Sequence, residues 1–300
     1  MSEFVKGENI VSAKDCRRTK RGYMSEVDDK ILHDLRKKIF LTGYKGGMAH
    51  LTSCFSCLEI VYSLYVKKIL RLNEENPKDN DRDRFIMSKG HAGLSLYACM
   101  AQRGLIPWST FESYLQEKND RGIGGEPCMR DCEWIEATTG SLGHGLSFGV
   151  GVAMGLRAQG KSSKVYVLLG DGECEEGTIW EAAMSAASFG LDNLVVILDM
   201  NEIQKMDTVA ATIGLDNWKE KFEAFGFTTR ETDGHDVEAI KNALTAVNDT
   251  GKPLLVVAHT IKGKGVSIME NNPNWHFKLP GRKELKVFMS ELGISDSELE

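Results

Sequence analysis

Five short, mainly apolar segments separated by stretches of helical pattern constrain the fold of this 300-residue chain most strongly. They cover residues 85–87, 165–169, 194–198, 227–229 and 254–258. Strands that are apolar on both faces are typical of a buried parallel sheet. Because helical patterns lie between them, we expect an α/β fold in which helices cover both faces of a parallel sheet and the crossovers are right-handed.

The composition favours a soluble chain with a large core. Hydrophobic residues make up 42% of the sequence, and there are 30 glycines. The formal net charge is -6 and the basic residues are interspersed with acidic ones, which disfavours binding to nucleic acid or to an anionic membrane. No run of apolar residues is long enough to span a membrane, and the N-terminal segment lacks the apolar core of a secretory signal. We therefore expect a cytoplasmic protein, and the seven cysteines fit a reducing compartment.

The pattern along the chain predicts a short arm followed by one domain. Residues 1–24 are polar and mixed in charge, whereas residues 25–300 carry the periodic apolar positions. Ser25 is expected to cap a helix that ends before Gly43, because acidic residues follow the serine and apolar residues then recur at helical spacing. A second helix is predicted over residues 56–69.

Two cysteines three positions apart raise the question of a zinc or redox site. Cys54 and Cys57 have the spacing of half a zinc site, but no second such pair or close histidine pair completes the ligand set. They also run into an apolar helical pattern. We therefore expect them to be small core residues.

Unusual polar residues follow two neighbouring strand candidates. Asp171 lies between Gly170 and Gly172 after one strand, and Asn201 and Ile203 follow the next. Ligands of open α/β sheets bind at the carboxyl ends of strands, so these residues are expected to converge there. Carboxylate, amide and carbonyl oxygens suit Mg²⁺, which usually keeps phosphate oxygens and water as further ligands. The arrangement predicts a magnesium ion that holds a diphosphate.

Each half of this pattern has an ordinary structural explanation. A Gly-Asp-Gly sequence is a common turn, and an asparagine at a strand end is often a cap. The combination, with roughly thirty residues between the two parts, is much more specific and resembles the thiamine-diphosphate fingerprint. It differs from a P-loop and from the dinucleotide-binding glycine motif.

Further motifs extend this resemblance over about residues 25–290. They are Ser88-Lys89-Gly90-His91, Thr139-Gly140-Ser141-Leu142-Gly143, Gly170-Asp171-Gly172 with Glu176, Asn201, Asp233-Gly234-His235-Asp236 and the segment from His259 to Gly265. In this order they resemble the N-terminal domain of transketolase, a thiamine-diphosphate-binding fold. Because full-length transketolases continue into a pyrimidine-binding and a C-terminal domain, the chain resembles the first subunit of a split transketolase.

The resemblance implies roles for particular residues. Asp171, Asn201 and the carbonyl of Ile203 are implied to hold Mg²⁺. The implied cofactor contacts also include Gly140, Leu142, Gly170 and Gly172. The implied active-site residues are His50, His91, His276 and Glu176, the last of which communicates across the subunit interface. Imidazoles suit a reaction that moves protons of substrate hydroxyls near neutral pH.

The other histidines of the motifs have structural interpretations. His144 opens a helix that runs through Val152, and His235 lies in a turn before the helix that follows Val237. His259 ends an apolar strand and could line the site, but its match to the family is weaker.

The activity implied by the resemblance is transfer of a two-carbon ketol unit from a ketose or ketose phosphate to an aldose. The glutamate that activates the cofactor in transketolases belongs to the pyrimidine-binding domain, so we expect the chain to need a partner subunit that carries the missing domains. An α2β2 assembly is the expected form. Two alternatives remain open, namely a subunit of a 2-oxo-acid decarboxylating carboligase that uses the same cofactor and a non-catalytic scaffold. The scaffold should have lost the pair of Asp171 and Asn201, which this chain keeps.

Three departures from the family pattern bear on the substrate. Glu126 stands where a histidine is usual before the cofactor loop, Thr52-Ser53 replace a common glycine pair, and Phe277 follows His276 where glycine is common. The hypothesis is that the donor pocket is altered, with Glu126 as the specificity candidate. The alternative is that Glu126 points to solvent.

Overall fold

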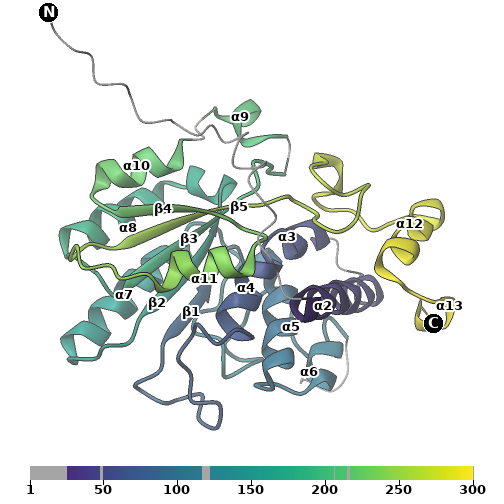
Figure 1. Ribbon diagram of the computed structural model, residues 1–300, viewed down its shortest axis with the longest axis horizontal. Coiled ribbons are helices and arrows are strands. Elements are labelled where there is room, and N and C mark those ends of the chain that lie inside the picture. The colour runs from purple at the N-terminus through teal and green to yellow at the C-terminus, as the bar shows by residue number, and fades with distance from the viewer. Residues whose placement is uncertain (1–25, 48–49, 117–121, 206, 215–216, 300) are drawn as a thin grey trace, which may run out of the picture.

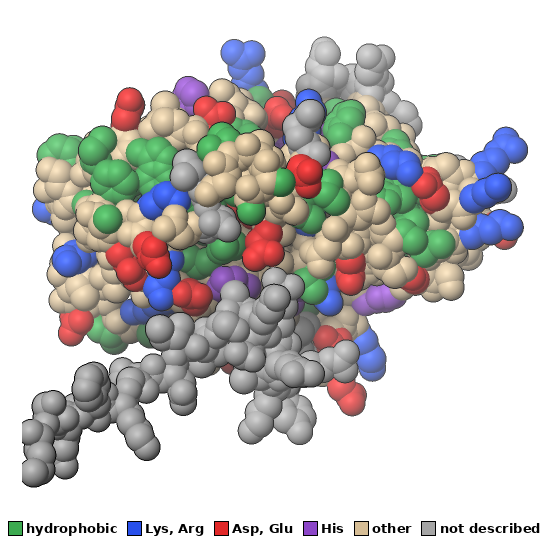
Figure 2. Space-filling model, turned by 90° about the horizontal axis from the view of Figure 1, so that it is seen from above, with side chains coloured by type: hydrophobic (Ala, Val, Ile, Leu, Met, Phe, Trp, Pro, Cys, Tyr) green, Lys and Arg blue, Asp and Glu red, His purple; other side chains and the backbone are tan. Residues whose placement is uncertain are grey.

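The computed structural model describes residues 26–47, 50–116, 122–205, 207–214 and 217–299. The polar arm predicted for residues 1–24 lies outside these ranges. Within them, no helix combines the length and the apolar character needed to cross a membrane. Figure 2 shows acidic and basic side chains interspersed over most of one face, as their distribution along the sequence suggests.

A five-stranded parallel sheet forms the centre of the fold, with the strand order β1-β2-β3-β5-β4 (Figure 1). The strands are β1 (Arg84–Met87), β2 (Val165–Gly170), β3 (Leu194–Met200), β4 (Thr228–Asp233) and β5 (Leu254–His259). Each of the five predicted segments overlaps one strand. β2 is buried at every position, and β3 and β5 at every position but the last, because helices cover both faces of the sheet.

Alternate residues of β1, β2, β3 and β5 pack into two separate cores. In β2, Tyr166 and Leu168 belong to one core, and Val165, Val167 and Leu169 belong to the other. The first core includes α4 (Leu58–Tyr65), α5 (Gly93–Arg103) and α11 (Val237–Thr245). The second includes α7 (His144–Ala158), α8 (Gly177–Ser188) and α10 (Trp218–Phe225). The predicted α/β fold with helices on both faces is therefore confirmed.

The boundaries of two predicted helices were wrong. The first helix, α2 (Glu26–Lys45), continues past Gly43, where we expected it to end. A Cβ atom on Gly43 would lie 2.8 Å from the Leu51 side chain, so this glycine permits close packing instead of ending the helix. The second predicted helix, over residues 56–69, is α4, which covers only residues 58–65, and a separate helix, α3 (Leu51–Ser56), precedes it and meets it at Cys57.

The remaining elements are short or lie near the C-terminus. They are α6 (Trp108–Glu112), α9 (Val209–Thr212), α12 (Arg282–Leu292), α13 (Asp296–Leu299) and the 3-10 segments η1 (Gly90–Ala92), η2 (Gly172–Glu175) and η3 (Pro273–Trp275). The segments η1 and η2 begin within three residues of the carboxyl ends of β1 and β2. They therefore bring the motif that contains His91 and the motif that contains Asp171 to the same edge of the sheet.

Cys54 and Cys57 lie in the core beneath this edge. Both are buried, and the thiol of Cys57 donates to the carbonyl of Ser53 at 3.3 Å. Burial raises the pKa of Cys54 to about 12 and that of Cys57 to about 11, so both thiols stay protonated at neutral pH. The prediction of small core residues is confirmed.

Candidate functional site

The carboxyl ends of β2 and β3 place Asp171 and Asn201 on neighbouring strand tips. In the parallel register Gly170 lies opposite Asp199, so the residues that follow each strand emerge side by side. Asp171 is 3% exposed and Asn201 is 4% exposed. Two polar side chains are thus held in a buried position at one edge of the sheet.

Backbone amides orient the oxygen atoms of these two side chains. The Asp171 carboxylate accepts from the amide of Gly172 at 2.8 Å and from the amide of Glu202, and the Asn201 side-chain oxygen accepts from the amide of Ile203 at 3.2 Å. Glu202 has a φ of +65°, which turns the chain sharply after β3. Burial raises the pKa of Asp171 to about 6. A bound cation would favour its charged form.

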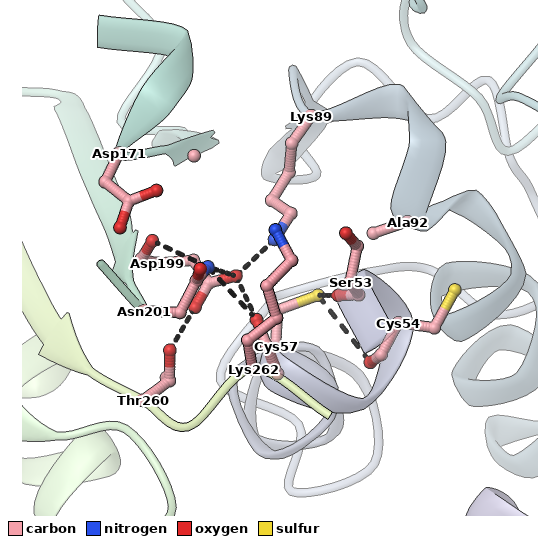
Figure 3. A network of polar contacts seen from close by, with 12 residues as sticks. Ser53, Cys54, Cys57, Lys89, Ala92, Asp171, Asp199, Asn201, Thr260 and Lys262 are labelled. Carbon is pink, nitrogen blue, oxygen red and sulfur yellow. Dashed lines mark hydrogen bonds and ion pairs between the residues drawn. The ribbon is translucent and has the colours of Figure 1, made fainter. Parts of the chain in front are cut away.

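Two buried lysines face the same space, and sequence reasoning assigned neither a role. Lys262 donates to the carbonyl oxygen of Ile203 at 2.7 Å, and Lys89 forms an ion pair with Asp199. Figure 3 shows the two lysine side chains approaching each other from opposite sides, with Asp199 and Asn201 beside their ends. Lysines are rarely buried unless paired. The signal available in the sequence was a lysine shortly after each of two strands, β1 and β5.

Glu173 is a third residue to which sequence reasoning assigned no role. Its buried carboxylate accepts from the amide of Gly143 at 2.9 Å, from the amide of Gly170 at 3.1 Å and from the hydroxyl of Ser88. It therefore ties the loop before α7 to the ends of β1 and β2. Burial raises its pKa. An acidic residue directly after the Gly-Asp-Gly turn was the available signal.

The loop that contains Gly140 and Leu142 packs on η1. Gly140 has a φ of +136°, and a Cβ atom on Gly90 would lie 2.7 Å from the Gly140 nitrogen. Glu126 lies against the same loop, because a Cβ atom on Gly140 would lie 2.3 Å from a carboxylate oxygen of Glu126. Leu142 is half-buried and Glu126 is exposed. Glu126 is thus both solvent-accessible and adjacent to the predicted cofactor loop.

The three predicted active-site histidines form a cluster. The ring centre of His50 lies 5.3 Å from that of His91 and 5.4 Å from that of His276, and the last two are 6.1 Å apart. His50 precedes α3, His91 lies in η1 and His276 follows η3. Three segments that are distant in sequence therefore contribute one imidazole each.

Burial and nearby lysines keep these imidazoles neutral at pH 7. Burial, assisted by Lys262, lowers the pKa of His50 to about 4 and that of His276 to about 3. Burial and Lys89 lower the pKa of His91 well below its usual value. Neutral imidazoles can both donate to and accept from hydroxyl groups.

The cluster also contains buried polar atoms that lack a partner among the described residues. They are Nδ1 of His50, Nδ1 of His276 and, on the cofactor loop, Oγ1 of Thr139. Buried polar groups are normally hydrogen-bonded, so such atoms fit a site that receives a polar ligand. Together with the oxygen set at Asp171 and the closely packed glycines, they fit a bound diphosphate cofactor and a hydroxylated substrate.

The other predicted residues lie around this centre. Glu176 is exposed at the start of α8, and His144 begins α7 with its Nδ1 3.2 Å from the Leu142 carbonyl. His259 pairs with Glu231 at 3.0 Å and so its side chain points toward β4. His235 does precede α11, as predicted, but its ring is engaged in a buried network.

Two of the three departures from the family pattern have a structural explanation. Thr52 is buried and donates to the carbonyl of Trp275 at 3.2 Å, and Ser53 is fully buried. Thr52 therefore links α3 to the segment that carries His276, and Ser53 is a core position of α3. Phe277 is 62% exposed and its ring centre lies 4.7 Å from that of His50, so it borders the histidine cluster.

Comparison of the sequence with known proteins identifies the family to which this chain belongs. Residues 41–299 match the family described as transketolase, thiamine diphosphate binding domain. The chain is 36% identical over 270 residues to one of the subunits of the apulose-4-phosphate transketolase of Actinobacillus succinogenes, covering 89% of this chain and 96% of that protein. It is 35% identical over 273 residues to the 6-deoxy-6-sulfo-D-fructose transketolase subunit SqwG of a Clostridium species, and this match covers 90% of this chain and 98% of that protein.

Solved structures give the same result. A transketolase variant from Pichia stipitis matches with a TM-score of 0.80 and 26% identity over 92% of this chain, but over only 43% of the longer chain. The chain belongs to the transketolase family, within its thiamine-diphosphate-binding domain. The predicted resemblance to the first subunit of split transketolases is confirmed, and the chain is a transketolase-like transferase subunit.

Proposed function

We propose that Asp171, Asn201 and the carbonyl of Ile203 hold the Mg²⁺ of a bound thiamine diphosphate. The observation that carries this proposal is that Asp171 and Asn201 lie at neighbouring tips of β2 and β3 and both accept from backbone amides of the turn formed by Glu202 and Ile203. Mg²⁺ prefers such hard oxygen ligands and usually keeps phosphate oxygens in its coordination shell. The ammonium of Lys262, 2.7 Å from the Ile203 carbonyl, would add positive charge beside the diphosphate.

Gly140, Leu142, Gly170 and Gly172 are proposed to line the cofactor site. Gly170 and Gly172 flank Asp171, and Glu173 connects the Gly140 loop to them through Gly143. Glycine lets the backbone approach a ligand closely. These contacts join the loop to the end of β2.

His50, His91 and His276 are proposed to contact the substrate. When bound, thiamine diphosphate supplies the carbon nucleophile and electron sink for transfer of a two-carbon ketol unit. The neutral histidines would hydrogen-bond the hydroxyl groups of the ketose and accept or return their protons. Phe277 would exclude water from one side of His50.

A second chain is proposed to complete the active site. The relatives that match this chain along nearly their whole length are named as subunits, whereas full-length transketolases are more than twice as long. We propose a partner with the pyrimidine-binding and C-terminal transketolase domains, and an α2β2 assembly. Glu176 is proposed to contact this partner, because it is exposed at the start of α8 while lying against Gly143 of the cofactor loop.

The donor is proposed to be a ketose or ketose phosphate, selected in part by Glu126. Relatives are named for apulose 4-phosphate and 6-deoxy-6-sulfo-D-fructose, so ketoses other than the common ones fit the family. Glu126 lies against the Gly140 loop, where its carboxylate could accept from a donor hydroxyl and would repel an anionic group placed nearby. In the assembled enzyme, Glu126→His should change the ratio of kcat/KM between two donor ketoses. An unchanged ratio contradicts this assignment.

The cytoplasm is proposed as the location. The six cysteines of the described ranges, among them Cys128 with partial exposure, are free thiols. Thiols persist in this state in reducing compartments. Fractionation of cells that produce the chain would test this proposal, and recovery outside the cytoplasm contradicts it.

Calorimetric titration of thiamine diphosphate with Mg²⁺ tests the central proposal. The chain is titrated alone and then together with the chain encoded beside its gene. We expect Mg²⁺-dependent binding that is tighter with both chains present, and we expect Asp171→Asn to abolish the Mg²⁺ dependence while the chain stays folded. Binding that is equally tight without Mg²⁺, or no binding by the folded pair of chains, overturns the proposal.

A further inference from the structure

The segment after β5 carries Lys262 to the candidate site, and three side chains outside the segment hold its backbone or side chains in place. Thr260 donates to Asp199, the amide of Ile261 donates to Nε2 of His235 at 2.7 Å, and Nε of Arg36 donates to the carbonyl of Lys264 at 2.9 Å. The position of the Lys262 backbone is thus set by contacts on both sides of it.

The hydrogen bonds of His235 define its tautomer. A backbone amide can only donate, so Nε2 of His235 must accept the bond from Ile261 and carries no proton. The other ring nitrogen, Nδ1, lies 3.1 Å from a carboxylate oxygen of Glu59 and therefore donates to it. The ring is neutral in this arrangement, with its proton on Nδ1.

Glu59 is itself fixed by a buried ion pair. Its side chain is 4% exposed, and its second carboxylate oxygen accepts from Arg36 of α2. Burial alone would raise the pKa of Glu59, but Arg36 and His235 together lower it to about 2. Glu59 therefore remains charged and keeps accepting from His235 across the working range of pH.

We infer that Arg36, Glu59 and His235 form a positioning network that holds Lys262 beside the Ile203 carbonyl. Arg36 lies on α2, Glu59 on α4 and His235 between β4 and α11. Through these hydrogen bonds the packed elements fix the position of the Ile261 amide, which is one residue from Lys262. Their hydrogen bonds described above join them to each other, to Ile261 and to Lys264, so they act on the site through the segment that carries Lys262 and are positioning residues. This inference rests on the proposed cofactor site.

Two substitutions of His235 separate positioning from general stability. In His235→Gln, the side-chain oxygen reaches the place of Nε2 and can still accept from Ile261. In His235→Asn, the shorter amide can reach Glu59 but leaves the Ile261 amide without an acceptor. In metal sites, removing a residue that hydrogen-bonds and orients a metal ligand typically lowers metal affinity by about 10–100-fold. We expect an effect of similar size for a residue that orients the segment beside the cofactor site. We expect His235→Asn to raise the dissociation constant for thiamine diphosphate with Mg²⁺ at least about tenfold and His235→Gln to restore most of the loss.

Hydrogen–deuterium exchange of the Ile261 amide tests its hydrogen bond to His235 without any need for the cofactor. Mass spectrometry of the full chain should show faster exchange in the peptide that contains Ile261 for His235→Asn and near wild-type exchange for His235→Gln. The matched control is His259→Asn, which removes another His–Glu pair near this segment. We expect this control to change neither exchange at Ile261 nor the dissociation constant.

The inference is overturned if His235→Asn leaves exchange at Ile261 and cofactor affinity unchanged, or if the Gln and Asn variants lose affinity equally. If the Asn variant does not fold, nitrogen NMR of the wild-type histidines decides. A His235 ring protonated on Nε2 overturns the inference, and one protonated on Nδ1 supports it. Failure of the wild-type chains to bind thiamine diphosphate would instead refute the proposed function, because the exchange and NMR results do not depend on the cofactor.

Discussion

Lys89 and Asp199 form a fully buried ion pair that spans β2, since Lys89 follows β1 and Asp199 lies near the end of β3. Asp199 also accepts from the hydroxyl groups of Ser56 and Thr260. Burial opposes the charge of Asp199, but Lys89 and these donors lower its pKa. The pair thus connects three segments beneath the candidate cofactor site.

Lys89→Met should destabilise the chain strongly. Removing one partner of a buried ion pair leaves the other charge uncompensated, which typically costs about 3–5 kcal/mol. Urea unfolding should show a loss of this size. The control is Lys161→Met, which breaks a surface pair with the well-exposed Asp81 and should cost less than about 1 kcal/mol. Equal losses for both variants would mean that Asp199 finds other compensation.

The histidine cluster should make stability depend on pH. His50 and His276 are neutral when folded down to a pH of about 4 and about 3, but protonate near 6.5 when unfolded. Their folded pKa values are depressed, so stability is complete above pH 6.5 and is lost as the pH falls toward 4. Each residue can contribute up to about 1.4 kcal/mol per pH unit in that window.

Urea unfolding between pH 7 and pH 4.5 measures this dependence. The variant His50→Gln with His276→Gln should show a flatter decline than the wild-type chain. His33→Gln, on an exposed position of α2, should leave the wild-type slope unchanged. A double variant with the wild-type slope would show that these two imidazoles do not resist protonation in the folded state.

Much of the fold could be predicted because strand signals were local. Segments such as 165–169 and 194–198 are apolar at every position, and helical patterns between them predict crossovers. The end of α2 was predicted too early because we interpreted Gly43 as a helix terminator. In the structure Gly43 lies inside the helix and allows close packing against Leu51, a tertiary contact that the local sequence does not reveal. The break at Cys57 likewise has no local signal.

Only those residues of the candidate site that belong to a recognisable sequence motif could be predicted. Asp171 and Asn201 follow strands, so topology alone brings them together. Lys262 and His235 are polar residues in loops, and nothing local shows that one is buried beside Ile203 and the other accepts from Ile261. Such roles depend on tertiary contacts between segments distant in sequence, which periodicity does not report.

Gly140→Ala should damage the cofactor loop for two separate reasons. The new Cβ atom would meet the carboxylate of Glu126 at 2.3 Å, and a φ of +136° is unfavourable for any residue with a side chain. Backbone strain of this kind costs about 1–3 kcal/mol. We expect a lower melting temperature and weaker binding of thiamine diphosphate. Gly155→Ala on α7 is the control, because its Cβ would contact nothing within 4 Å and alanine should stabilise the helix by about 0.5–1 kcal/mol.

Adding Glu126→Ala to the Gly140→Ala variant separates the two causes. If the clash dominates, the double variant should recover most of the cofactor affinity, because alanine removes the carboxylate that the Cβ atom meets. If the backbone strain dominates, recovery should be small, since φ at residue 140 is unchanged. Wild-type affinity in the single variant would contradict both causes and would mean that the loop takes another conformation when the cofactor binds.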